Sequence, residues 1–357
     1  MKKTISLFSL LGSLFASTTA QAAYQLLDLS VYLDASSNYA TSSGLNDSDA
    51  ATGMGSSFNP VYWTGSAAQN LATLGGSSGM AFGVNNAGQS VGWSNLAGDS
   101  TWHATLWNNT TTATDLGTLG GNNSEAFAIN SAGNVVGWSH NAAGTSRATL
   151  WSGANIIDLG AVDSSTESEA YGINASNQIV GLSIIGSTRY ATAWSYDGSN
   201  ISVTNLGVGE AYAINDSGTI VGVSGDSAVF WSGGNMTTLT SLFGESTASD
   251  INNAGLIVGE SRDASGDYHG VLWSGGSIFD LTTLLDQSLI DAGWLITDAL
   301  SINDQGNILA YAEDGTGNGR TVLLFSASAV PEASTYLMLM FGLCLLAFQK
   351  RRLKASA

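Results

Sequence analysis

The sequence predicts an all-β protein, a closed seven-bladed β-propeller built from four-stranded repeats of about 43 residues. Three observations predict it. A short motif ending in Asn recurs seven times at steps of 37 to 51 residues, a period typical of propeller blades. Each repeat holds several short strand-like stretches. The last repeat lacks its fourth stretch, and a matching stretch stands near the N-terminus. The seven motif copies are Gly44–Asn46, Ala81–Asn85, Ala126–Asn130, Ala170–Asn174, Ala211–Asn215, Ala248–Asn252 and Ala299–Asn303.

The copy ending at Asn130 shows how one repeat is built. Ala126–Asn130 alternates small and large residues, as a strand does. Ser131–Gly133 is a turn whose glycine can adopt the left-handed conformation. The returning strand is Asn134–Ser139, the third is Arg147–Trp151 and the fourth is Ile156–Gly160. Four short antiparallel strands make one blade.

Tryptophan ends the third strand in six of the seven repeats, and Leu324 takes its place in the last. The six are Trp63, Trp107, Trp151, Trp194, Trp231 and Trp273. We interpret this column as packing between blades, because the neighbouring strand positions are also apolar and a buried Trp is worth about 3–5 kcal/mol. The alternative is a ring of exposed platforms on which sugars stack.

The fourth strand predicts how the ring closes. It recurs as Asp115–Gly117, Asp158–Gly160, Asn205–Gly207 and Asp280–Leu281. After Leu324 no such stretch follows, whereas Gln25–Ser30 matches it before the first repeat. We expect this N-terminal strand to complete the seventh blade, because closure removes exposed sheet edges. An open array of repeats would not need such a permutation.

The charge of the chain is unevenly distributed. The net charge is −18, and six of the ten basic residues are Lys2, Lys3, Lys350, Arg351, Arg352 and Lys354, at the two ends. The strongly acidic body between them argues against nucleic-acid binding. The single cysteine, Cys344, lies outside that body, which therefore has neither disulfides nor thiol catalysis.

Both ends predict export rather than fold. Residues 1–23 have the charged start, the apolar stretch and the small residues Ala20 and Ala22 of a cleavable signal peptide. At the other end, residues 330–357 hold a Pro-Glu segment, an apolar run over 336–348 and a basic cluster. The apolar run is shorter than the roughly 20 residues that span a bilayer comfortably. The basic cluster would stay in the cytoplasm, leaving the Pro-Glu segment within reach of a membrane-embedded protease. A retained tail anchor is the alternative.

The C-terminal segment resembles the PEP-CTERM sorting signal of Gram-negative bacteria. The residues that carry the resemblance are Val330, Pro331, Glu332, Ala333, Ser334 and Thr335. The Pro-Glu pair is intact, but Ala333 stands where the family often has a second Pro. The resemblance implies processing by an exosortase-type protease and membrane contact through the tail before processing. It also implies a place in the cell envelope, at the surface or in the extracellular matrix, in a bacterium that makes exopolysaccharide.

The repeats resemble the HAF family of extracellular repeats over residues 40–325. The His-Ala-Phe motif on the third strand is degenerate here, as His103–Thr105, His269–Val271 and Arg147–Thr149. The family has no assigned chemistry, so the resemblance implies export and a repeat propeller over 24–329. His103, His140 and His269 are interpreted as repeat or loop residues, because equivalent positions on distant blades cannot share a metal. Asp47, Asp49 and Asp304 are interpreted as turn residues.

One acidic constellation is a candidate site. Glu125, Glu169, Glu210 and Asp298 directly precede the first strand of their repeats. If that strand is innermost, their carboxylates gather near one mouth of the channel. We interpret them as a solvated acidic rim. The alternatives are a site that binds calcium weakly, or paired acids for sugar chemistry. Against the second, the sequence shows no basic or aromatic partner that would shift their pKa values.

We therefore expect a non-enzymatic surface or biofilm-matrix protein without a cofactor, which presents a rigid propeller to exopolysaccharide or to other surface proteins. The alternative is a glycan-active hydrolase or lyase that uses the acidic rim. It predicts sugar release that is lost on substitution of Glu169 by Gln.

Overall fold

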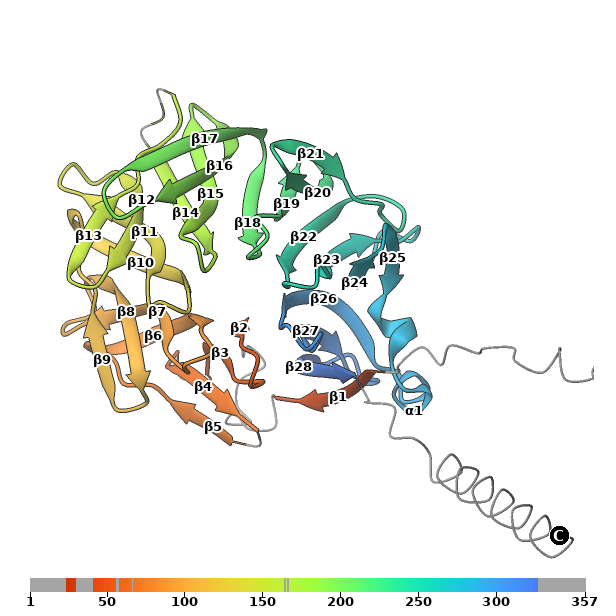
Figure 1. Ribbon diagram of the computed structural model, residues 1–357. Helices are drawn as coiled ribbons and strands as arrows, with labels where there is room; N and C mark the ends of the chain where they lie inside the picture. The colour runs from red at the N-terminus through yellow and green to blue at the C-terminus, as the bar shows by residue number, and fades with distance from the viewer. Residues whose placement is uncertain are drawn as a thin grey trace, which may run out of the picture. The chain divides into compact units, whose positions relative to one another are not determined.

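The computed structural model describes residues 24–29, 41–55, 58–65, 67–163, 165 and 167–326. Tyr24–Phe325 forms one compact unit, in which seven four-stranded sheets are arranged in a ring around a channel (Figure 1). The predicted seven-bladed propeller is confirmed. The first strand of each repeat is innermost and the fourth is outermost.

The first four blades follow one another along the chain. Their strands, from the channel outward, are β2 (Thr41–Leu45), β3 (Ala51–Met54), β4 (Pro60–Thr64) and β5 (Ala67–Asn70) in blade 1; β6 (Gly75–Val84), β7 (Ser90–Leu96), β8 (Trp102–Asn109) and β9 (Thr112–Asp115) in blade 2; β10 (Gly120–Ile129), β11 (Val135–Asn141), β12 (Ser146–Ser152) and β13 (Asn155–Asp158) in blade 3; β14 (Glu167–Ile173), β15 (Gln178–Ile185), β16 (Thr188–Tyr196) and β17 (Ile201–Val208) in blade 4.

The last three blades complete the ring, and two short helical segments, η2 (Leu281–Leu284) and α1 (Gln287–Asp291), lie between blades 6 and 7. The strands are β18 (Glu210–Ile214), β19 (Ile220–Ser224), β20 (Ser227–Ser232) and β21 (Asn235–Thr238) in blade 5; β22 (Ser246–Ile251), β23 (Ile257–Arg262), β24 (Tyr268–Ser274) and β25 (Ser277–Asp280) in blade 6; β26 (Leu295–Ile302), β27 (Ile308–Glu313), β28 (Gly319–Ser326) and β1 (Tyr24–Asp28) in blade 7.

The N-terminal strand closes the ring as predicted. β1 pairs with β28, so the first strand of the chain is the outermost strand of the last blade (Figure 1). Directly after β1, the Leu29 N–H donates to the Thr321 carbonyl at 2.9 Å, and the Leu29 side chain is only 3% exposed. At the other end of β1, the Tyr24 hydroxyl donates to the carbonyl of Gly306.

The tryptophan column packs between blades. The six side chains are 1–3% exposed and Leu324 is fully buried, which confirms the packing interpretation and excludes exposed sugar platforms at these positions.

Close packing also requires the glycine of the second strand. A Cβ on Gly137 would lie 1.9 Å from the carbonyl oxygen of Glu125 on the inner strand, so any side chain there would push the two strands apart.

The asparagine that ends each motif joins its blade to the next. Its side-chain carbonyl accepts the N–H four residues later and so closes the turn. Its side-chain amide donates to the main-chain carbonyl of the equivalent asparagine on the following blade, at 2.9–3.1 Å. The asparagine ring, 3–5% exposed, consists of Asn46, Asn85, Asn130, Asn174, Asn215, Asn252 and Asn303.

Candidate functional site

A β-bulge in the inner strand of each of blades 2 to 7 places one side chain on the channel wall. In blade 3 the pairing with the second strand skips Phe127, and in blades 4 and 5 it skips Tyr171 and Tyr212. The same shift in blade 2 falls at Phe82. Bulges turn a side chain away from the regular alternation of a strand. The fold therefore repeats one local irregularity, and the sequence places an aromatic residue on it in four consecutive blades.

These four residues form a continuous aromatic arc along the channel wall. The ring centroids of Phe82 and Phe127 are 5.2 Å apart, those of Phe127 and Tyr171 are 5.4 Å apart, and those of Tyr171 and Tyr212 are 6.0 Å apart. Tilted and edge-on contacts at such separations are favourable. The bulge position of blade 6 holds Ser249, so the arc ends there and leaves open space.

The channel is hollow at both mouths. The mouth beside the asparagine ring has a hollow of about 270 Å³, and about 260 Å³ follows farther in. The opposite mouth, which we call the aromatic mouth, has a cavity of about 440 Å³ lined by the aromatic arc. That volume is within the roughly 300–1,000 Å³ of small-molecule pockets.

Two carboxylates from blades 6 and 7 line the same cavity. Asp298 comes from the inner strand β26, and Glu260 comes from the second strand β23, behind the small inner-strand residues Thr247 and Ser249. Burial, and then the charge of Asp298, raise the pKa of Glu260 to about 7. Burial raises the pKa of Asp298 to about 6. Asp298 Oδ1 is buried and accepts no hydrogen bond from the described residues.

The other three predicted acids have partners, which corrects the expectation that they have no basic or aromatic ones. Glu125 accepts a hydrogen bond from the Trp102 indole N–H at 3.0 Å, and burial raises its pKa. Glu169 accepts one from the Tyr171 hydroxyl at 2.7 Å. Glu210 pairs with Arg189 at 2.7 Å. The contacts of Glu125 and Glu210 reach from one blade to the next, so the sequence order conceals them. The contact of Glu169 lies within β14, where Tyr171 follows two residues later.

Two of these acids affect the pKa values of the tyrosines in the aromatic arc. Burial, followed by the charge of Glu169, raises the pKa of Tyr171 far above its ordinary value. Burial, followed by Glu210, does the same for Tyr212. Both phenols therefore stay protonated at physiological pH. Glu169 orients Tyr171 beside the cavity, while Asp298, of the four predicted acids, lines the cavity itself.

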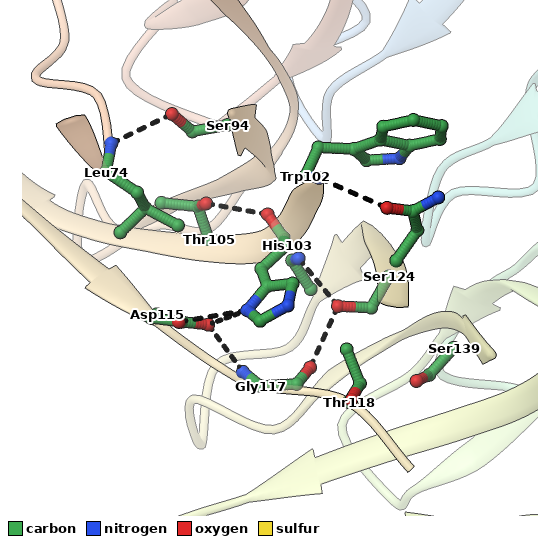
Figure 2. A network of polar contacts seen from close by, with 12 residues as sticks. Leu74, Ser94, Trp102, His103, Thr105, Asp115, Gly117, Thr118, Ser124 and Ser139 are labelled. Carbon is green, nitrogen blue, oxygen red and sulfur yellow. Dashed lines mark hydrogen bonds and ion pairs between the residues drawn. The ribbon is translucent and has the colours of Figure 1, made fainter. Parts of the chain in front are cut away.

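The histidines of the degenerate motif pair with the fourth strand. His103 Nδ1 lies 2.8 Å from Asp115 Oδ1, which also accepts the Gly117 N–H (Figure 2). His269 pairs with Asp280 in the same way at 2.8 Å. His140, in contrast, packs against Trp138 with ring centroids 4.9 Å apart. Each motif histidine fastens an outer strand, and the two lie on different blades.

The predicted turn aspartates also join blades. Asp47 accepts the N–H of Asp304 at 2.9 Å, across the seam between blades 7 and 1. Asp49 accepts hydrogen bonds from the side chains of Asn303 and Asn307 at the same seam. Across the described residues, no three His, Cys, Asp or Glu side chains have an arrangement that could hold a metal ion.

Several predicted residues lie outside the described part of the chain. These are the signal-peptide residues Ala20 and Ala22 and the sorting segment Val330–Thr335. Where the structure does describe the chain, it contains no helix with the length and apolar character to cross a membrane.

Comparison with known proteins identifies the C-terminal segment. Residues 329–352 match the PEP-CTERM protein-sorting motif. The chain therefore carries an export and surface-sorting signal of Gram-negative bacteria, which is processed by the membrane protease exosortase. No curated protein matched the sequence.

Three solved structures are distantly similar to the chain. They are TolB from Acinetobacter baumannii (10% identity, TM-score 0.40, 66% of this chain and 63% of that chain), a puromycin-hydrolyzing peptidase from Mycobacterium tuberculosis (9%, 0.45, 84% and 55%) and a gluconolactonase from Xanthomonas campestris (10%, 0.40, 73% and 91%). The chain spans less than two thirds of the length of the first two. Similarities this remote say nothing of activity.

Proposed function

We propose that this surface-sorted propeller is a non-catalytic binding protein of the exopolysaccharide matrix, and that the aromatic mouth holds a saccharide. The observation that carries the proposal is the aromatic arc, four rings in contact along one wall of a 440 Å³ cavity. Sugar rings present C–H faces that pack on aromatic rings, and a few polar groups then fix their orientation.

The polar groups at this mouth suit such a ligand. Thr247, Ser249, Glu260 and Asp298 all lie beside the arc and offer hydroxyl and carboxyl oxygens. The sorting signal supports export to the cell surface, where we place the matrix polysaccharide. Ring contacts between neighbouring blades hold the aromatic wall of the cavity in place, which lowers the entropy lost on binding.

The same carboxylates make a glycan hydrolase or lyase the second candidate. A carboxylic acid with its pKa near 7 can act as a general acid at neutral pH, and here a second acid stands beside it. The residue to test for catalysis is therefore Glu260 rather than Glu169, because Glu169 is engaged with Tyr171.

The test is to screen the purified full chain against an oligosaccharide array and measure hits by calorimetry, assaying the same samples for released reducing ends. Phe127→Leu removes a central ring of the arc and should weaken binding roughly threefold to tenfold. Phe243→Leu is the control, because Phe243 is an aromatic side chain 72% exposed outside the cavity. Binding without release, sensitive to Phe127, supports the proposal. Release that stops with Glu260→Gln favours the enzyme.

A further inference from the structure

Among the described residues, no base forms an ion pair with either carboxylate of the aromatic mouth. Of the cations on the adjoining strands, Arg262 pairs with Glu245 at 3.3 Å and lies over the Tyr268 ring, 4.6 Å from its centroid. Arg189 pairs with Glu210. Arg262 lowers the pKa of Glu260 less than burial and Asp298 raise it.

Asp298 has a buried oxygen atom that lacks a hydrogen-bond donor in the described part of the chain. It faces Tyr311 across the strand pair β26–β27, and burial followed by the charge of Asp298 raises the pKa of Tyr311 to about 12. A contact from the Ala299 main-chain N–H lowers the pKa of the Asp298 carboxyl, but its Oδ1 atom is buried and accepts no hydrogen bond from the described residues. A buried carboxylate oxygen without a donor costs free energy, and a ligand donor that reaches it recovers that cost.

The two halves of the cavity wall favour the same kind of ligand group. Aromatic faces attract cations through the negative potential above the ring. Two carboxylates that share a cavity attract a cation as well, and here the charge of Asp298 hinders ionisation of Glu260. An ammonium group supplies three N–H donors. A neutral sugar hydroxyl interacts less strongly than an ammonium group with both the aromatic faces and the carboxylates.

We propose that the saccharide held at the aromatic mouth is an amino sugar with a free, protonated amine. Its ammonium group lies between Glu260 and Asp298, and its ring packs on the aromatic arc. This inference rests on the proposed function and adds the substrate class. It requires that replacing the charged amine by a neutral acetamide weakens binding, and that this difference depends on Glu260 and Asp298.

The experiment compares glucosamine oligosaccharides with their N-acetylated counterparts, which have the same backbone but a neutral nitrogen. Titration calorimetry of the full chain at about pH 7 keeps the amine and Asp298 mostly charged and Glu260 about half charged. We expect the free amines to bind at least about tenfold more tightly. Glu260→Gln and Asp298→Asn should each reduce that preference, and the double variant should abolish it.

Two controls keep the outcomes distinct. Glu313→Gln makes the same charge change at an exposed position of β27 and should leave the preference intact. Thermal unfolding verifies that the cavity variants are folded. Equal affinity for both oligosaccharides, or a preference that survives the double variant, overturns the amino-sugar inference but leaves saccharide binding in place. No binding of either, with Phe127→Leu indistinguishable from the parent, overturns both.

Discussion

The side-chain amide of Asn303 donates a hydrogen bond to the main-chain carbonyl of Asn46 at 3.0 Å, although 257 residues separate them in the chain. It is the last of seven equivalent bonds, and it turns a row of repeats into a ring. The same asparagine accepts the N–H of Asn307 and thereby closes its own turn. One buried amide thus holds both the local turn and the seam between the last and first blades.

Replacing Asn303 should lower the free energy of unfolding. Asn303→Ala leaves the Asn46 carbonyl and the Asn307 N–H without this partner, and we expect the free energy of unfolding to fall by about 2–4 kcal/mol. Asn303→Asp keeps the acceptor but sets a buried carboxylate against the Asn46 carbonyl and the Asp49 carboxylate, so it should cost at least as much as Asn303→Ala. Urea denaturation of the purified chain measures both. Asn253→Ala, at an exposed neighbouring turn position, serves as control. A loss under 1 kcal/mol for Asn303→Ala would show that the asparagine ring is dispensable.

The stability of the propeller should fall as pH rises through the neutral range. The pKa of Glu260 rises from 4.5, its ordinary value, to about 7 in the folded chain. The pKa of Asp298 rises from 3.8 to about 6 on folding. The folded state therefore binds more protons between these values. The stability that these two acids contribute is complete below about pH 4 and is lost by about pH 7. Glu260→Gln should flatten this decline and stabilise the chain at about pH 8. Thermal melts across pH test it, and a parallel decline in parent and variant would refute it.

Asp250 should clamp blade 6 to blade 7. Its Oδ2 accepts the Ser301 hydroxyl at 2.8 Å and the Ile302 N–H at 2.9 Å, while its Oδ1 accepts the Ile251 N–H. Asp250→Ala should lower the free energy of unfolding by about 3 kcal/mol, because it strands the Ser301 and Ile302 donors. Ala213→Gly at the equivalent position of blade 5 is the control, with about 1 kcal/mol expected. Denaturant midpoints of the two variants should therefore differ clearly.

The tryptophans should not all be equivalent. The Trp231 indole N–H donates to the Leu206 carbonyl at 3.1 Å, whereas the buried Trp194 indole N–H has no hydrogen-bond partner among the described residues. Trp→Phe removes similar apolar contacts at both sites. We therefore expect Trp231→Phe to destabilise by about 1 kcal/mol more than Trp194→Phe. Equal losses in matched urea titrations would mean that the indole bond contributes nothing.

Closure by β1 should protect a sheet edge. Leu29→Asp places a charge in the apolar contact with Leu309 and Leu323, and we expect a loss of about 3 kcal/mol or more together with self-association through the edge of β28. Gln25→Asp, at an exposed position of the same strand, should change little. Light scattering and denaturation distinguish the two. A monomeric, fully stable Leu29→Asp chain would contradict this role of β1.

The repeats made the fold predictable because the same contacts recur in every copy. The missing fourth strand after Leu324 and the matching stretch at Gln25 were enough to predict closure. The site was harder. Glu260 lies on the second strand of one blade only, so no repeat pattern marks it. The aromatic residues at 82, 127, 171 and 212 were visible in consecutive copies. However, they alternate with small residues as any strand does, and only the bulge explains why they face the channel.

Closure by the first strand also sets an order of events during secretion. A chain threaded outward from its N-terminus delivers Tyr24–Asp28 before any blade, yet the neighbour of that segment, Gly319–Ser326, leaves last. Six sheets consist of strands that are consecutive in the chain and can form as these strands emerge. The seventh sheet can form only after β28, the last strand, has emerged. Such distant pairing is slow and exposes unpaired edges meanwhile. The sorting motif at 329–352 follows directly on the strand that completes the seventh sheet. In a chain exported from its N-terminus, every strand of the ring therefore leaves before the sorting motif does.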